Sequence, residues 1–272
     1  MRTVAEMRQE DDDGMRGAVE AAAGDLLGSL ATLADPDFAT RTQRYFPREI
    51  RALGVSNASV VELANDYFRE RPGLPATQRL ALTEEVLSRA SYHEEVLLGF
   101  ALLHKVARAG LGSELLDRCE YWLETHVSNW AQCDDLCLKL LYPFFRGHLD
   151  QIPRTRRWVE SPSPWARRAA NVAVVKFVRR KVGRTVFELP LSHVFDNCAR
   201  LMHDEDVYVQ KGCGWLLKVT AEIHQDEVAA FLRKHHTEMN RDTFRYAIEK
   251  MDPGTRTSLA LQPTHRRARR EK

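Results

Sequence analysis

Apolar residues recur at intervals of three and four along nearly the whole chain, as in Val96, Phe100, Leu103 and Ala107. This spacing lines one face of an α-helix, because the helix repeats every 3.6 residues. No sustained run alternates apolar and polar residues in the way that a half-buried strand does. The pattern therefore predicts an all-α protein.

Proline and glycine pairs divide this pattern into segments of helical length. Helices joined by turns this short can pair into units of roughly 35 to 45 residues, the size of a HEAT repeat. We therefore expect a curved α-solenoid of HEAT-like helical repeats, with a long concave face for its ligand rather than a closed pocket. The expected helices span, to within a few residues, 15–34, 38–52, 57–71, 75–90, 92–108, 111–127, 130–146, 151–160, 164–182, 190–203, 206–222, 224–237 and 241–250.

The two ends of the chain differ from the helical middle in composition. Residues 1–14 include the acidic run Asp11 to Asp13, and the last residues include Arg266-Arg267-Ala268-Arg269-Arg270. Runs of like charge favour disorder. We expect a flexible acidic N-terminus at 1–14, one repeat domain at 15–251 and a disordered basic tail at 252–272.

Several classes of protein have no support in the sequence. No stretch approaches the roughly 18 uninterrupted apolar residues of a membrane span, and the acidic start is unlike a secretory signal. The five cysteines form no CxxC pair, and phosphate-loop, GxGxxG, GxSxG and HExxH motifs are absent. We expect a cytoplasmic monomer, associated with the nucleoid in a bacterium or nuclear in a eukaryote, that uses no metal and no cofactor.

Positive charge is concentrated in the middle of the chain, although the net charge is only +2. Residues 151–184 contain ten lysines and arginines against the single acid Glu160. A basic block inside structured sequence predicts a surface for phosphates. For any one of these side chains, a solvated helix face is an equally good interpretation.

Two helical segments combine aromatic and charged side chains on one face. Asn129 is a suitable N-cap with Gln132 three residues later, so Trp130 and Asp134 lie one turn apart on the helix that follows. In the second segment, Lys211, Trp215 and Lys218 share a face. Taken singly, a carboxylate in the first turns of a helix and a tryptophan in a core are common structural features.

Several segments, in order, resemble the DNA alkylation repair (AlkD-like) family of HEAT-repeat DNA glycosylases over residues 26–251. The chain differs from the family pattern at Asn129, where relatives often have a tryptophan, and around Pro47–Ile50. The segments that carry it are Leu33-Ala34-Asp35-Pro36, Tyr45-Phe46 with Leu53-Gly54-Val55, Trp130-Ala131-Gln132-Cys133-Asp134, Trp158, Trp165-Ala166-Arg167-Arg168-Ala169-Ala170, Val209-Gln210-Lys211-Gly212-Cys213-Gly214-Trp215 and Arg241 to Ile248.

The resemblance implies an alkylpurine DNA glycosylase that hydrolyses the N-glycosidic bond of N3- or N7-alkylated purines in duplex DNA, within base excision repair. It implies that Asp134 is the catalytic carboxylate and that Trp130 and Trp215 flank the damaged nucleotide. The residues that we expect to contact DNA are Tyr45, Arg167, Arg168, Lys211, Lys218, Arg241 and Arg245.

Two other functions remain open from the sequence. The chain could be a catalytically silent repeat protein that binds distorted or branched DNA, or a scaffold for protein interactions. The combination of Trp130, Asp134 and Trp215 favours the enzyme, because neither alternative needs a carboxylate that faces phosphates.

Overall fold

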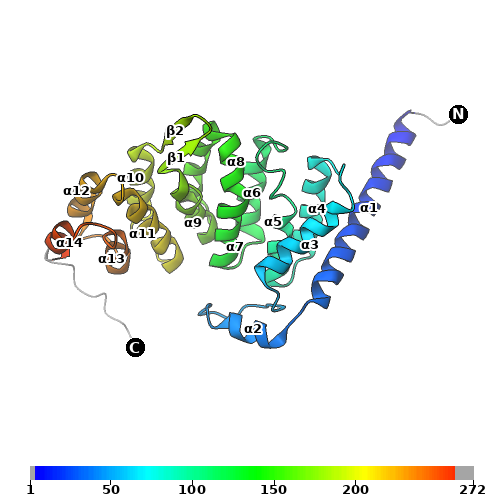
Figure 1. The fold of residues 1–272 in the computed structure, drawn as a ribbon, viewed down its shortest axis with the longest axis horizontal. Coiled ribbons are helices and arrows are strands. Elements are labelled where there is room, and N and C mark those ends of the chain that lie inside the picture. The colour runs from blue at the N-terminus through cyan, green and yellow to red at the C-terminus, as the bar shows by residue number, and fades with distance from the viewer. Residues whose placement is uncertain (1–3, 261–272) are drawn as a thin grey trace. The chain divides into compact units, whose positions relative to one another are not determined.

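The computed structural model describes residues 4–260, and their side chains from residue 14 onward. These residues form fourteen α-helices, short stretches of π- and 3₁₀-helix and one two-stranded hairpin (Figure 1). The prediction of an all-α protein is confirmed. Among residues 4–260, none of the helices combines the length and the apolar composition that crossing a membrane requires.

The described residues divide into two compact units. Unit 1 comprises residues 4–115 and 139–147. It contains the end of the π-helix η1 (Leu136–Leu141) and these α-helices: α1 (Val4–Thr32), α2 (Pro36–Gln43), α3 (Asn57–Arg69), α4 (Ala76–Arg89), α5 (His93–Ala101) and α8 (Tyr142–Gly147).

Glu94 of α5 holds the segment that follows α2 in unit 1. Its buried carboxylate accepts the backbone N–H groups of Leu53, Gly54 and Val55 at 2.8, 2.8 and 3.2 Å. Gly54 has φ +79°, and a Cβ there would lie 2.0 Å from the carbonyl oxygen of Asp35. Only glycine fits this close approach.

Unit 2 comprises residues 116–138 and 148–260. It contains most of α6 (Glu114–Thr125), followed by α7 (Trp130–Asp135), the 3₁₀-helix η2 (Leu149–Glu160), α9 (Pro164–Val172), the 3₁₀-helix η3 (Val175–Phe177), β1 (Arg179–Val182), β2 (Thr185–Glu188), α10 (Leu191–Arg200), α11 (Val207–Ala221), α12 (Gln225–His235), α13 (Arg241–Ala247) and α14 (Pro253–Ala260).

Hydrogen bonds between successive helices of unit 2 recur at a nearly constant sequence separation. Ion pairs join Arg154 to Asp117 and Arg167 to Asp204 across 37 residues, and Glu124 accepts from Ser161 across the same interval. Further contacts span 40 residues. A period of 37 to 40 residues matches the repeat length expected from the sequence, and it shows that equivalent positions of neighbouring helical pairs stack on each other.

The two ends differ from the expectation. Helix α1 begins at Val4, so residues 4–14, expected to be flexible, belong to this helix. At the other end, residues 253–260 form α14, in which Leu259 is fully buried. The expected disordered tail is therefore wrong for these eight residues, because an apolar side chain anchors them. Residues 261–272 of the expected tail lie outside the described residues.

The largest error lies in the expected helix 164–182. The α-helix ends at Val172, and β1 and β2 pair antiparallel, with Arg180 opposite Phe187 and Val182 opposite Thr185. Gly183, in the two-residue turn, has φ +61°. A positive φ in a two-residue turn and β-branched residues around it favour a hairpin over a helix.

Candidate functional site

Asp134 lies on the second turn of α7, whose start agrees with the prediction. The side chain of Asn129 accepts the backbone N–H groups of Ala131 and Gln132, both at 3.1 Å. Gln132 in turn accepts the N–H of Ser128 at 2.8 Å. The Asn129 cap fixes where α7 begins, and Trp130 and Asp134 follow as half-buried side chains one turn apart.

A two-pronged ion pair fixes the carboxylate of Asp134. Arg168 of α9 donates from Nε to Oδ1 and from Nη2 to Oδ2, each at 2.9 Å. Its Nη1 donates to the carbonyl oxygen of Tyr208, at the start of α11, at 2.7 Å. Arg168 therefore ties three helices of unit 2 together and sets the orientation of the carboxylate.

The exposure of the pair is asymmetric: 6% of the Arg168 side chain is accessible, against 16% for Asp134. Burial works to lower the pKa of Arg168, but the hydrogen bonds and the charge of Asp134 outweigh it and raise that pKa above its usual value. The guanidinium thus stays charged beneath a carboxylate that solvent reaches.

Aromatic side chains are carried by α9 and α11, the helices that Arg168 joins. Tyr208, Lys211 and Trp215 are spaced to share one face of α11, and Trp215 is half-buried. The Tyr208 ring lies 5.7 Å from that of Trp165, and the Lys211 ammonium lies 5.2 Å from the Tyr208 ring. Sequence reasoning did not single out Tyr208, although its helical spacing from Lys211 was a usable signal.

Of two glycines in α11, one permits a close approach to a neighbouring helix. A Cβ at Gly214 would lie 2.9 Å from the Tyr246 ring and 3.1 Å from the carbonyl oxygen of Thr243. Glycine at this position therefore permits close contact between α11 and α13. At Gly212 the nearest atom, Cγ of Arg168, would be 3.5 Å away, which is ordinary contact.

Four of the seven residues expected to contact DNA are exposed. Tyr45, just after α2 in unit 1, has 75% of its surface accessible. Lys211 of α11 and the two arginines of α13, Arg241 and Arg245, are also exposed. These four positions are compatible with a DNA contact.

The other three, Arg168, Arg167 and Lys218, make contacts within unit 2. Arg168 is bound to Asp134, as described above. Arg167 pairs with Asp204 and donates to the carbonyl oxygen of Ser161. The Lys218 ammonium lies 3.9 Å from the Tyr246 ring and 3.5 Å from Glu249, and only 14% of this side chain is accessible.

The basic block at 151–184 is also less positive at the surface than its sequence indicates. Arg154 and Arg157 both pair with Asp117, at 2.8 and 2.6 Å, and Arg156 pairs with Asp196 at 2.7 Å. Hydrogen bonds from Arg157 foremost lower the pKa of Asp117 below its usual value. The acidic partners come from neighbouring repeats, so a window of local sequence does not show them.

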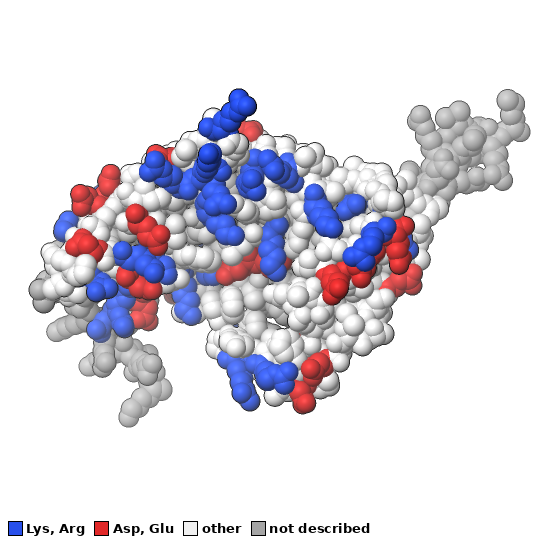
Figure 2. Space-filling view, in the orientation of Figure 1, with Lys and Arg blue, Asp and Glu red and all other residues white. Residues whose placement is uncertain are grey.

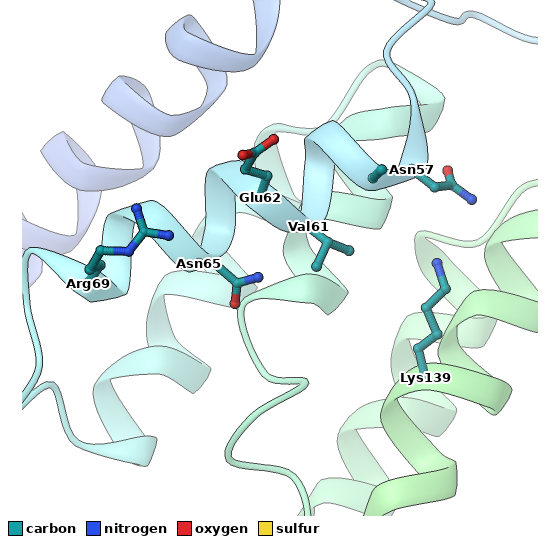
Figure 3. A pocket seen from close by; sticks show the side chains of 7 residues that line it. Asn57, Val61, Glu62, Asn65, Arg69 and Lys139 are labelled. Carbon is teal, nitrogen blue, oxygen red and sulfur yellow. The ribbon is translucent and has the colours of Figure 1, made fainter.

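Unit 1 contains an open pocket of about 600 Å³ that the sequence did not indicate (Figure 3). Asn57, Val61 and Asn65 of α3 line it, and the Lys139 side chain extends toward them from η1. Amides and an ammonium group make it a polar recess. Neither unit, within the described residues, holds a cluster of three or more His, Cys, Asp or Glu side chains placed for a metal ion.

The fold and this site define a helical-repeat protein that presents a fixed, solvent-accessible carboxylate on helices that also carry aromatic side chains. The family model described as DNA alkylation repair enzyme matches residues 26–251. The chain belongs to this family.

Two solved structures are similar in fold. A "Predicted DNA alkylation repair enzyme from Enterococcus faecalis" superposes with a TM-score of 0.68 at 14% identity, covering 81% of this chain and 97% of the other. The protein smu.31 from Streptococcus mutans UA159 gives a TM-score of 0.52 at 16% identity, covering 72% and 99%. A search of curated proteins finds no match.

Proposed function

We propose that this protein is a DNA glycosylase that releases N3- and N7-alkylated purines from duplex DNA. The observation that carries the proposal is the Asp134 carboxylate, which Arg168 holds by two hydrogen bonds while leaving it open to solvent. Membership of a DNA alkylation repair family supports the choice of substrate.

The proposed reaction is hydrolysis of the bond between the base and C1′ of the deoxyribose. As the bond breaks, its electron pair moves to the cationic base, which leaves neutral, and positive charge develops on the sugar. A fixed carboxylate beside the sugar stabilises that charge and orients the attacking water. The water oxygen bonds to C1′, and its proton is lost to solvent. Asp134 is assigned this role.

Trp130 and Trp215 are assigned to the damaged nucleotide, which their π faces attract through sugar C–H groups and the charge of the base. Tyr45, Lys211, Arg241 and Arg245 are assigned to the duplex around it. Arg168 has a different assignment, which is to position Asp134. All the proposed catalytic side chains come from one chain, so the enzyme is proposed to act as a monomer on DNA in the nucleoid or nucleus.

The proposed hydrolysis is tested with a series of DNA duplexes that carry different damaged bases. We expect release of 7-methylguanine and 3-methyladenine from duplex DNA and no release of uracil, because a neutral base leaves only with activation that this mechanism does not supply. The measurement is single-turnover cleavage of the resulting abasic sites by alkali, on duplexes that differ only in the damaged base.

Other results of this assay would favour one of the two alternative functions or contradict the proposed chemistry. Binding to these duplexes without excision would make the chain a DNA-binding repeat protein, and absence of binding would favour a protein scaffold. Efficient release of uracil would contradict the proposed leaving-group chemistry.

The two tryptophans give a second prediction. Because Trp130 and Trp215 are only half-buried, replacing either by alanine should lower excision strongly and the melting temperature little. The matched control is Trp158→Ala in η2, since Trp158 is 1% exposed and truncating a buried tryptophan costs about 3 to 5 kcal/mol. Thermal melts and excision per folded molecule decide the matter. A melting temperature as low as that of the control, with normal excision, would assign both tryptophans to the core.

A further inference from the structure

Only two arginines are buried among the described residues, and they differ in what balances their charge. Arg168 of unit 2 is 5% exposed and binds the Asp134 carboxylate at two points. Arg79 of α4 in unit 1 is 8% exposed, and no carboxylate of the described residues lies within ion-pair distance of it. Buried charges in proteins are normally paired. The described part of the chain supplies no such pair for Arg79.

The guanidinium of Arg79 makes one hydrogen bond and lies over one aromatic ring. Its Nε donates to the carbonyl oxygen of Leu74 at 3.2 Å, and its Cζ lies 3.7 Å from the centre of the Phe68 ring. The ring attracts the cation but supplies no negative charge. Nη1 and Nη2 have no partner among the described residues, and both reach solvent. The donor end of the side chain is therefore available to a ligand.

The pKa values of the two buried arginines reflect this difference. Burial lowers the pKa of Arg79 below its usual value, with no carboxylate to offset the effect. At Arg168, the hydrogen bonds and charge of Asp134 outweigh burial and raise the pKa. Since a guanidinium stays charged in proteins, Arg79 is a poorly solvated cation. An anion at Nη1 and Nη2 would stabilise it.

The first turn of α4 offers further donors beside this guanidinium. The helix has 14 residues, and its N-cap, Pro75, makes no side-chain cap hydrogen bond. The N–H groups of residues 76–78 have no acceptor within the helix. Arg79 is the fourth helical residue, and its bond to Leu74, which precedes the N-cap, directs the guanidinium back toward this turn. Thr77 is exposed, so solvent reaches the turn.

These donors suit the phosphate group of a small molecule. A phosphomonoester has a charge of about −1.5 to −2 at neutral pH and three acceptor oxygens, and helix N-termini bind such groups. On the face that Figure 2 shows, the basic side chains of unit 1 lie in separate small groups, some of them beside acidic residues. A local site of this kind fits a small ligand better than a polyanion, which needs an extended positive surface.

We propose that Arg79 and the first turn of α4 form a binding site for the phosphate of a small phosphomonoester or for free phosphate. Nη1 and Nη2 of Arg79 and the backbone N–H groups of residues 76–78 donate to its oxygens. The site lies in unit 1 and requires neither Asp134 nor damaged DNA, so it goes beyond the proposed function.

The test is the binding of inorganic phosphate, glycerol phosphate and acetate, measured by isothermal titration calorimetry in a chloride buffer. We expect both phosphates to bind more tightly than acetate, which has one charge and two oxygens. Arg79→Met keeps an unbranched apolar side chain over Phe68 and removes the charged donors. It should weaken the binding of both phosphates about tenfold or more.

The matched control is Arg71→Met, which removes the same charge close by in the sequence. Arg71 also lies over an aromatic ring, that of Tyr67, at 4.1 Å, but its side chain is 46% exposed and pairs with Glu70. This variant should bind phosphate as the parent does.

Nuclear magnetic resonance locates the bound phosphate in the parent protein, and it decides the matter if Arg79→Met does not fold. Inorganic phosphate should shift the backbone amide signals of residues 76–78 most strongly. Shifts that are largest outside α4 would overturn the proposed site.

The calorimetric outcomes are equally decisive. Binding that persists in Arg79→Met, an equal loss in the control, or no phosphate binding by the parent overturns the site. Acetate binding as tight as phosphate binding overturns the choice of ligand. Inorganic phosphate binding without glycerol phosphate binding assigns the site to the free ion.

Two measurements with DNA separate this inference from the proposed function. If Arg79→Met lowers the slope of log K against log salt for duplex binding by about 0.9, a backbone phosphate occupies the site and the small ligand is overturned. Absence of excision by a parent that binds phosphate at Arg79 removes the glycosylase and supports the site.

Discussion

Replacing Asp134 by asparagine is expected to lower the excision of 7-methylguanine by on the order of 10²-fold or more. The amide keeps the shape of the side chain and an oxygen that accepts from Arg168, but it loses the charge that stabilises the developing sugar cation. The measurement is the single-turnover rate with enzyme saturating the DNA. The affinity for the duplex, measured by anisotropy, should survive.

The stability of this variant must be measured beside its activity. Arg168 is 6% exposed, and removing one partner of a buried ion pair costs about 3 to 5 kcal/mol in typical cases. The excision rates of the variant and the parent are therefore compared at a temperature below the melting temperature of both proteins. Each rate is expressed per folded molecule. Equal rates for the variant and the parent under these conditions would remove Asp134 from the mechanism.

Replacing Arg168 by alanine is expected to reduce excision to a similar degree while leaving the salt dependence of DNA binding unchanged. The guanidinium contacts Asp134 and the Tyr208 carbonyl, so its loss frees the carboxylate to rotate but removes no phosphate contact. Single-turnover rates and the slope of log K against log salt measure the two effects separately.

Arg168→Lys is the matched control. Lysine keeps the positive charge but not the planar fork that binds both carboxylate oxygens, so we expect partial recovery of the excision rate. A loss of slope near 0.9 in the alanine variant would instead place the guanidinium on a phosphate and contradict its assignment as a positioning residue.

Local sequence was enough to predict most of the helices and the start of the candidate site. Asn129 and Gln132 mark the beginning of α7, and helical spacing puts Trp130 and Asp134 on one face. These features are predictable because helix caps and helical faces depend on residues within four positions of each other. Ordered motifs over residues 26–251 similarly indicated the family that the match confirms.

The partners of the charged side chains were decided by tertiary structure. Arg168 meets Asp134 across 34 residues, and Arg167 meets Asp204 across 37. Read locally, both arginines looked like phosphate ligands. Which carboxylate faces which arginine depends on how successive helical pairs stack, and that stacking is set by packing along the whole repeat. For the same reason part of the positive charge of residues 151–184 is neutralised, because Arg154, Arg156 and Arg157 pair with acidic residues of neighbouring helices.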